Sequence, residues 1–95
     1  MTLHVVAHFH ARPDSGAALR LLLEPLVAVT RTEDGCLAYR LFQDEADPAH
    51  FVFVEEWRDA ASLEVHLALP HLAAMVADAQ PLLARPIEVT RLQEC

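Results

Sequence analysis

The segment at residues 51–57, FVFVEEW, decides the fold because large apolar side chains recur along it at every second position. Successive side chains of a strand point to opposite faces of a sheet. One face of this predicted strand carries Phe51, Phe53, Glu55 and Trp57. The opposite face carries Val52 and Val54. Both faces are therefore largely apolar, and a sheet built on this strand needs a cover on each side.

The rest of the chain supplies further strands and two helical regions. Alternating, β-rich segments predict strands at residues 3–10, 36–43 and 87–92. Apolar positions three and four residues apart predict a helix from residue 15 to about 32, with a kink at Pro25. A second helical region runs from Asp59 to about 79 and restarts at Pro70. The order β-α-β-β-α-β is that of a ferredoxin-like α+β fold, in one domain spanning residues 1–95.

Composition excludes several classes of partner. Fourteen acidic residues face seven arginines and no lysine, so the formal net charge is −7. Such a chain repels phosphate backbones and anionic lipid, so we expect no nucleic-acid or membrane partner. Two cysteines are too few for a disulfide framework, and no apolar stretch is long enough to span a bilayer. We expect a soluble, cytoplasmic domain, small enough to be only marginally stable as a monomer.

The second sheet face predicts an assembly. Two helical regions can cover only one face of a four-stranded sheet, and the chain has no third layer. The uncovered face should carry Val6, Val52 and Val54, and alternation adds Leu37, Tyr39 and Leu41. We therefore predict a homodimer in which two copies pack sheet to sheet.

Three residue types in the covered space are candidates for chemistry. Glu55 and Trp57 are two residues apart and should both point between the sheet and the helices. A buried carboxylate needs a partner or must keep its proton, and His66 is the candidate partner. The pair could equally serve only to join helix to sheet, and Trp57 could belong to the core or form a pocket wall. His71, just after Pro70, could contact the helix start or face a ligand.

Other histidines and a cysteine are expected to have structural roles only. His4, His8 and His10 alternate along the first predicted strand, but that segment contains no cysteine or acidic partner, so we expect no metal site. Cys36 follows Gly35 with nothing nearby to lower its pKa, and a small buried hydrophobe is the better interpretation. The chain contains no phosphate loop and no dinucleotide fingerprint.

Three spaced motifs together resemble a known family. Glu33-x-Gly35-Cys36-x-x-Tyr39, Glu55-x-Trp57 and His66-x-x-x-Pro70-His71 are similar in order and spacing to the antibiotic biosynthesis monooxygenase (ABM) domain family, nearest to its small bacterial quinol monooxygenases. The resemblance covers nearly the whole chain. It implies a dimeric α+β barrel with a pocket between each sheet and its helices. It also implies oxidation of a small quinol or polyphenol by O₂, without metal, flavin or haem.

The resemblance assigns roles to residues. It implies His66 as general base or proton shuttle, oriented by Glu55, with Trp57 and Phe53 stacking on the substrate ring. Tyr39 and His71 complete the expected substrate-binding set. The asparagine and tyrosine that bind substrate in the polyketide-tailoring relatives are replaced here by Phe53 and Leu63. Val76 lies near the position of the haem-ligating histidine of the haem-degrading relatives, so haem is not expected.

Two other functions remain open at this point. One is an isomerase or other proton-transfer enzyme that uses the same residues without O₂. A phosphorylated substrate would then need a cation from Arg40, Arg58 or Arg85 facing the pocket. The other is a dimeric binding module without catalysis.

Overall fold

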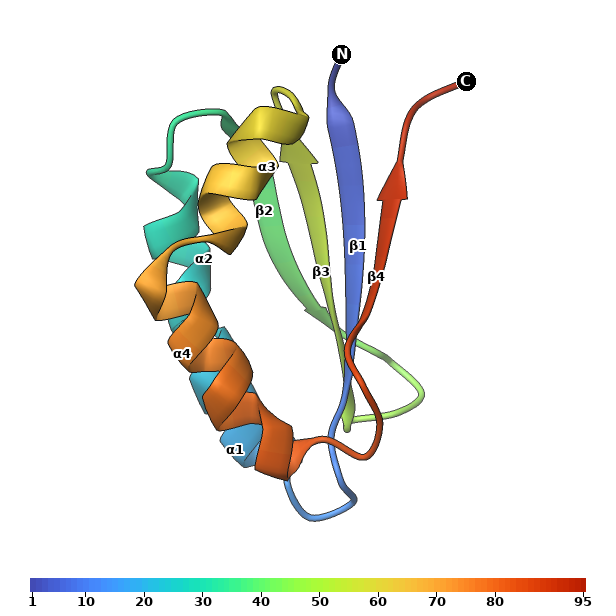
Figure 1. Cartoon of the computed structure of the whole chain (residues 1–95). Coiled ribbons are helices and arrows are strands. Elements are labelled where there is room, and N and C mark those ends of the chain that lie inside the picture. Colours follow the sequence, from blue (N-terminus) through green and yellow to red (C-terminus); the bar gives the residue numbers. More distant parts are fainter.

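A computed structural model describes residues 1–95, with all the helices on one face of a four-stranded sheet (Figure 1). The sheet is antiparallel, in the order β2-β3-β1-β4. Its strands are β1 (Leu3–His10), β2 (Cys36–Gln43), β3 (His50–Trp57) and β4 (Glu88–Leu92). The helices are α1 (Gly16–Leu23), α2 (Pro25–Arg31), α3 (Ala60–Leu67) and α4 (Pro70–Ala79), followed by a 3₁₀ turn, η1 (Gln80–Leu82). The ferredoxin-like α+β fold is thereby confirmed.

The core lies between the sheet and the helices and is built from alternate strand residues. On β1 these are Leu3, Val5, Ala7 and Phe9, all buried. On β3 they are Phe51, Phe53, Glu55 and Trp57, as alternation predicts. Phe9 meets Phe53 edge to face, with ring centroids 5.7 Å apart, a favoured aromatic geometry. The core thus places one acidic side chain, Glu55, in a mainly apolar layer.

Local signals explain where the helices begin and end. Proline has no N–H and clashes with the preceding turn, so the first helical region is divided at Pro25 into α1 and α2. Asp59 caps α3, since its side chain accepts a hydrogen bond from the Ser62 N–H at 2.8 Å. Gly35 adopts a φ of 87°, the left-handed conformation that glycine favours, just before β2 begins.

An irregularity in β2 overturns part of the predicted face assignment. Cys36 pairs with Trp57 and Ala38 pairs with Glu56, so the pairing register shifts at this point. The extra residue reverses which side chains face the helices from Ala38 onward. Tyr39 pairs with Glu55 and is buried, and Leu41 packs against the core. The expectation that Tyr39 and Leu41 lie on the uncovered face is therefore wrong.

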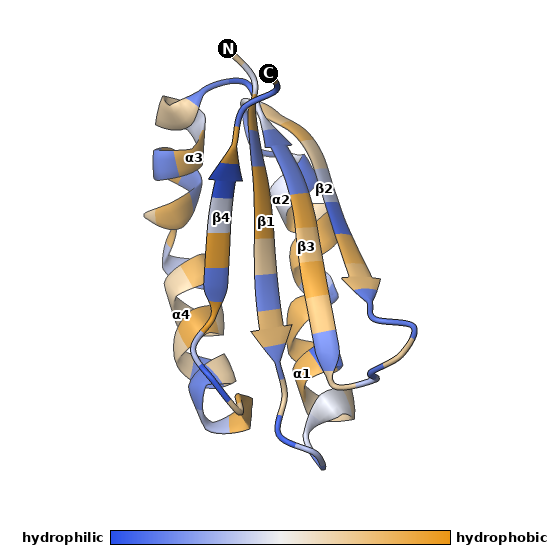
Figure 2. Ribbon diagram, turned by 90° about the vertical axis from the view of Figure 1, so that its right-hand side faces the viewer, coloured by the Kyte–Doolittle hydropathy of each residue, from blue (hydrophilic) through white to orange (hydrophobic).

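The other sheet face has no helix over it, as predicted. Figure 2 views the sheet from this side, with the helices behind it. Val6 pairs with Val54 there, and Phe42 is 47% exposed. We call the surface formed by Val6, Phe42, Val52 and Val54 the open face. No single helix is long and apolar enough to cross a membrane; α3 and the segment 70–82 reach that length only together, across a 65° bend.

Candidate functional site

A cavity of about 100 Å³ lies between the sheet and helices α3 and α4. Fifteen residues line it, and all but Glu55, His66 and Arg91 are hydrophobic. Its apolar rim includes Leu67, Val76 and Val89, which are partly exposed, so its mouth lies between the helices and β4.

His66 projects from α3 into the cavity and is held there by Glu33. Its Nδ1 lies 2.9 Å and 3.0 Å from the two carboxylate oxygens of Glu33, which follows α2 in the chain. The His66 side chain is 3% exposed and that of Glu33 is 14% exposed. The interaction is therefore shielded from water, and it fixes the orientation of the ring.

The bond to Glu33 determines what the other nitrogen of His66 can do. In the neutral ring, a proton on Nδ1 is donated to Glu33, and Nε2 keeps a free lone pair. If Nε2 takes up a proton, the carboxylate stabilises the resulting imidazolium. A carboxylate behind an imidazole that faces an apolar cavity is the arrangement of a general base.

Glu55 is a second proton-transfer group in the cavity and is held separately. Its Oε1 accepts a hydrogen bond from the Trp57 indole N–H at 2.9 Å. Burial raises the pKa of Glu55 to about 7, and the nearby Glu33 carboxylate adds to this, while the bond from Trp57 opposes it. Glu55 can therefore exchange a proton near neutral pH.

The predicted pairing of Glu55 with His66 is wrong. His66 binds Glu33 and Glu55 binds Trp57, so the two groups share the cavity without a mutual hydrogen bond. Sequence reasoning missed Glu33 as the partner of His66 because the two residues are 33 positions apart in the chain. Its place in the Glu33-x-Gly35 motif was the one available signal.

The predicted substrate-binding residues divide into two groups. Phe53 and Tyr39 line the cavity, and burial raises the pKa of Tyr39 above its ordinary value, so its hydroxyl stays protonated. Trp57 does not line it: this fully buried side chain packs behind His66, with ring centroids 4.7 Å apart. His71 is exposed in the first turn of α4, outside the cavity. Trp57 is thus placed to position Glu55 and His66 rather than to stack on a ligand.

The cation at the cavity is one that sequence reasoning did not name. Arg40, Arg58 and Arg85 are absent from the cavity lining. Arg91 of β4 lines the rim, where it forms an ion pair with Glu64 at 3.0 Å. Both side chains of this ion pair are largely exposed to water, so the pair is weak.

Other reactive groups lie away from this cavity. The half-buried Cys36 has a raised pKa, chiefly through burial, so its thiol is a poor nucleophile. A surface depression of about 420 Å³ beside α1, α2 and β2 is lined by three arginines and Glu24, with no histidine. His8 and His10 meet His50 on the uncovered side of the sheet. Partial burial and the charge of Arg85 lower the pKa of His10.

The family model, the relatives and the solved structure that match this chain agree with one another. Residues 2–78 match the family described as "Antibiotic biosynthesis monooxygenase". "Putative monooxygenase Rv0793" of Mycobacterium tuberculosis is 41% identical over 88 residues, covering 93% of this chain and 86% of that protein. "Putative monooxygenase YcnE" of Bacillus subtilis is 29% identical, covering 92% of each chain. The solved structure of Rv0793 superposes with a TM-score of 0.93 at 36% identity, covering 100% of this chain and 96% of that one.

Proposed function

The chain belongs to the antibiotic biosynthesis monooxygenase family, and we propose that it oxidises a small quinol or polyphenol with O₂ in the cavity that holds His66 and Glu55. The family and the names of its relatives support a monooxygenase-type function. The observation that carries the finer proposal is the Glu33–His66 pair, which leaves Nε2 as a base in an apolar cavity.

The chemistry of quinols explains why such a cavity is suitable. A neutral phenol reacts slowly with triplet O₂, whereas a phenolate readily gives up one electron. In the proposed reaction, His66 Nε2 removes a phenolic proton, and Glu33 stabilises the imidazolium that forms. The apolar walls then keep bulk water away from the oxygenated intermediate.

The proposed reaction balances without an external reductant. One oxygen atom replaces a ring hydrogen and the other leaves as water. The ring itself becomes a hydroxyquinone and supplies the four electrons that O₂ accepts. Glu55, with its pKa of about 7, is the group that would return a proton to the departing oxygen.

The size of the cavity limits the substrate. An engineered cavity of about 150 Å³ holds benzene, so a space of about 100 Å³ accepts a single ring only with some opening at the rim. Val89 and Arg91 on the short edge strand β4 form part of that rim. We therefore expect monocyclic quinols to be better substrates than fused-ring ones.

A homodimer is part of the proposal. The open face presents Val6, Phe42, Val52 and Val54, and the helices of residues 1–95 all lie on the opposite side of the sheet. A second copy packed sheet to sheet would cover both apolar surfaces, in agreement with the dimeric barrel that the family resemblance implies. Each half of such a dimer would keep its own cavity on the helical side.

Oxygen uptake with a panel of hydroquinones tests the proposed reaction. His66→Ala should lower turnover at least about 10²-fold, the usual scale for a general acid–base residue. Glu33→Gln should also lower it, because the amide supports the imidazolium less well than a carboxylate. His71→Ala is the matched control, since this exposed histidine lies outside the cavity and its loss should leave turnover unchanged.

The other outcomes separate the competing functions. Undiminished turnover in His66→Ala would remove this residue from the mechanism. Proton exchange at a bound ligand without oxygen uptake would identify a proton-transfer enzyme, for which the same Glu33–His66 pair is suitable. Ligand binding with neither activity would identify a binding module.

A further inference from the structure

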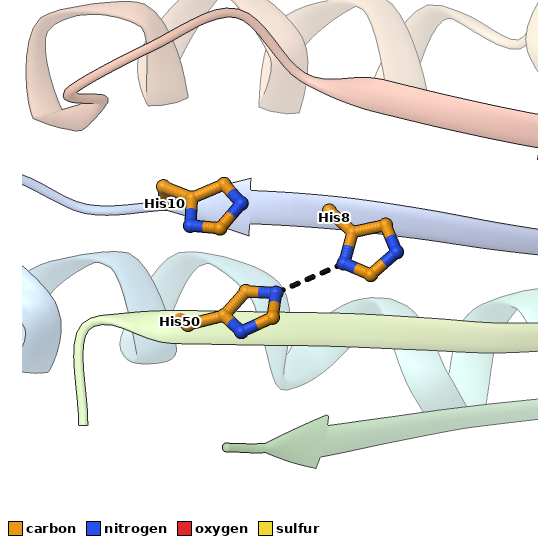
Figure 3. Close-up of side chains that lie close together, drawn as sticks. All are labelled: His8, His10 and His50. Carbon is orange, nitrogen blue, oxygen red and sulfur yellow. Dashed lines mark hydrogen bonds between the residues drawn. The ribbon is translucent and has the colours of Figure 1, made fainter. Parts of the chain in front are cut away.

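Three histidines gather on the uncovered side of the sheet, remote from the cavity. His8 and His10 come from β1 and His50 comes from the start of β3, and Figure 3 shows their rings side by side. Each can offer one ring nitrogen such that these atoms all lie within 4.8 Å of one another. We call these three residues the histidine cluster. The strand register produces it, because His10 pairs directly with His50 and His8 lies two residues before His10.

The closest contact in the cluster joins two ring nitrogens directly. His8 Nδ1 lies 2.9 Å from His50 Nε2, so one of these atoms must carry the proton that the other accepts. One nitrogen therefore offers a lone pair and the other its N–H. A metal ion that displaced this proton would accept a lone pair from each nitrogen.

Asp44 orients His50 from the opposite side of the ring. Its Oδ2 accepts a hydrogen bond from His50 Nδ1 at 2.8 Å, and its Oδ1 accepts one from the Ala46 N–H at 2.8 Å. The β2–β3 connection is thus built around this carboxylate. A carboxylate on the far nitrogen of a histidine is the usual outer partner of a metal-binding imidazole, because it fixes the tautomer and makes the ring a better ligand.

The donor set determines which ions suit the cluster. Three imidazoles favour a borderline transition metal such as Zn²⁺, Cu²⁺ or Ni²⁺, whereas Mg²⁺ and Ca²⁺ prefer oxygen. Tetrahedral Zn²⁺ with Zn–N bonds of about 2.0–2.1 Å needs nitrogens about 3.3 Å apart. The 2.9 Å contact and the 4.8 Å limit bracket that separation. Among the charged groups near the cluster, Asp44 and Glu88 favour a bound cation and Arg85 opposes it.

One adjustment is needed before an ion can bind. The rings are stacked, and the His10 and His50 ring planes differ by only 6° with centroids 4.2 Å apart. Lone pairs lie in the ring planes, so the rings must turn about their Cβ–Cγ bonds to converge on one ion. In the single chain all three side chains are partly exposed, which leaves room for this rotation; in the proposed dimer they lie on the sheet face that the second copy covers.

We propose that His8, His10 and His50 bind one divalent transition-metal ion of the Zn²⁺ type, with Asp44 as the outer carboxylate. The site has three protein ligands and one coordination position left for water. The proposal departs from the expectation of no metal because the missing ligand comes from β3, outside the segment that holds the other two. It is independent of the proposed oxidation, since the histidine cluster does not line the cavity.

Titration of the untagged chain with Zn²⁺, against a competing chelator, tests this site. The expected result is one ion per chain, with at least a tenfold loss of affinity in His10→Ala and in His50→Ala. Asp44→Asn should weaken binding about 10–100-fold, the usual effect of losing an outer carboxylate. His4→Ala is the matched control: His4 lies on the same strand and face but pairs with Glu56 at 3.4 Å, outside the cluster.

Two further measurements distinguish loss of the metal site from loss of the fold. Co²⁺ should give the visible absorption of a tetrahedral nitrogen site in the wild type and in His4→Ala, but not in His10→Ala. Thermal unfolding without metal checks that each variant is folded. The proposal is overturned if the wild type shows no saturable binding. It is also overturned if a folded His10→Ala or His50→Ala binds Zn²⁺ as tightly as the wild type.

Discussion

At the scale of single residues, Glu55 is a carboxyl group that folding moves from water into an apolar layer. Its side chain accepts a hydrogen bond from the Trp57 indole, and its pKa rises from 4.5 to about 7. Because the folded state holds the proton more tightly than the unfolded state, the stability linked to this group is full below pH 4.5. It is lost as the pH rises through about 7.

Glu55→Gln should remove this pH dependence. Glutamine can still accept the Trp57 N–H through its carbonyl oxygen and carries no charge. Between pH 5 and pH 8 the variant should gain about 2 kcal/mol in free energy of unfolding relative to the wild type, since one pKa unit corresponds to about 1.4 kcal/mol. Urea unfolding at both pH values measures the difference. Parallel stability profiles for the two proteins would show that Glu55 is not perturbed by burial.

The pairing of His66 with Glu33 could not be predicted from the sequence, whereas the burial of Glu55 could. Apolar surroundings for Glu55 and Trp57 follow from the alternation at residues 51–57, because a strand has a period of two. The partner of His66 depends instead on how the end of α2 approaches α3, and the two residues are 33 positions apart. No local pattern encodes that approach. The position of His50 beside His8 and His10 was not predicted for the same reason, since it depends on the pairing of β3 with β1.

At the scale of elements, one inserted residue in β2 changes which side chains reach the cavity. Strand and helix positions follow from periodicity and from the prolines, and the structure has them within a few residues of the predicted bounds. The register shift between Cys36 and Ala38 is not encoded by periodicity, since it arises from pairing with β3. It brings Tyr39 to the cavity wall, where the family resemblance had placed it and alternation had not.

Gly35 fixes the connection that leads into this strand. Its φ of 87° is strained for any other residue, and an added Cβ would lie 2.2 Å from Ser62 Oγ. Gly35→Ala should therefore lower the free energy of unfolding by about 3 kcal/mol, combining left-handed strain with overpacking. Denaturant unfolding measures this loss. Gly16→Ala serves as the comparison, because Gly16 lies in α1 and its added Cβ would come no closer than 3.2 Å, to the Pro48 carbonyl oxygen.

Gly16→Ala should change the free energy of unfolding by no more than about 1 kcal/mol, the difference in helix propensity between the two residues. Equal effects of the two substitutions would contradict the role given to Gly35. A loss of stability confined to Gly35→Ala would support it.

At the scale of the whole molecule, one face of the sheet is covered by helices and the other is not. The helices cover one face and enclose the cavity, while the open face keeps Val54 at its centre with 39% of the residue exposed. If a second copy covers the open face, Val54→Arg should convert the dimer to a monomer, because each chain would bury an unpaired charge in the interface. Sedimentation at micromolar concentration measures the change.

Val65→Arg is the matched control for the assembly. Val65 is an exposed valine on α3, on the helical side of the molecule, so its replacement should leave the dimer intact. A wild-type chain that sediments as a monomer would contradict the sheet-to-sheet dimer. Dissociation by Val65→Arg but not by Val54→Arg would place the interface on the helical side instead.

The central claim is that a carboxylate-held imidazole in a dry cavity binds a phenolic ring and removes its proton. Anaerobic titration with a monocyclic nitrophenol tests it most directly, because the nitrophenolate anion absorbs at longer wavelength than the acid. Below the pKa of the free phenol, the wild type and His71→Ala should shift the bound ligand to its anion, whereas His66→Ala should leave it protonated. Absence of binding, or the same ionisation in wild type and His66→Ala, would contradict the claim.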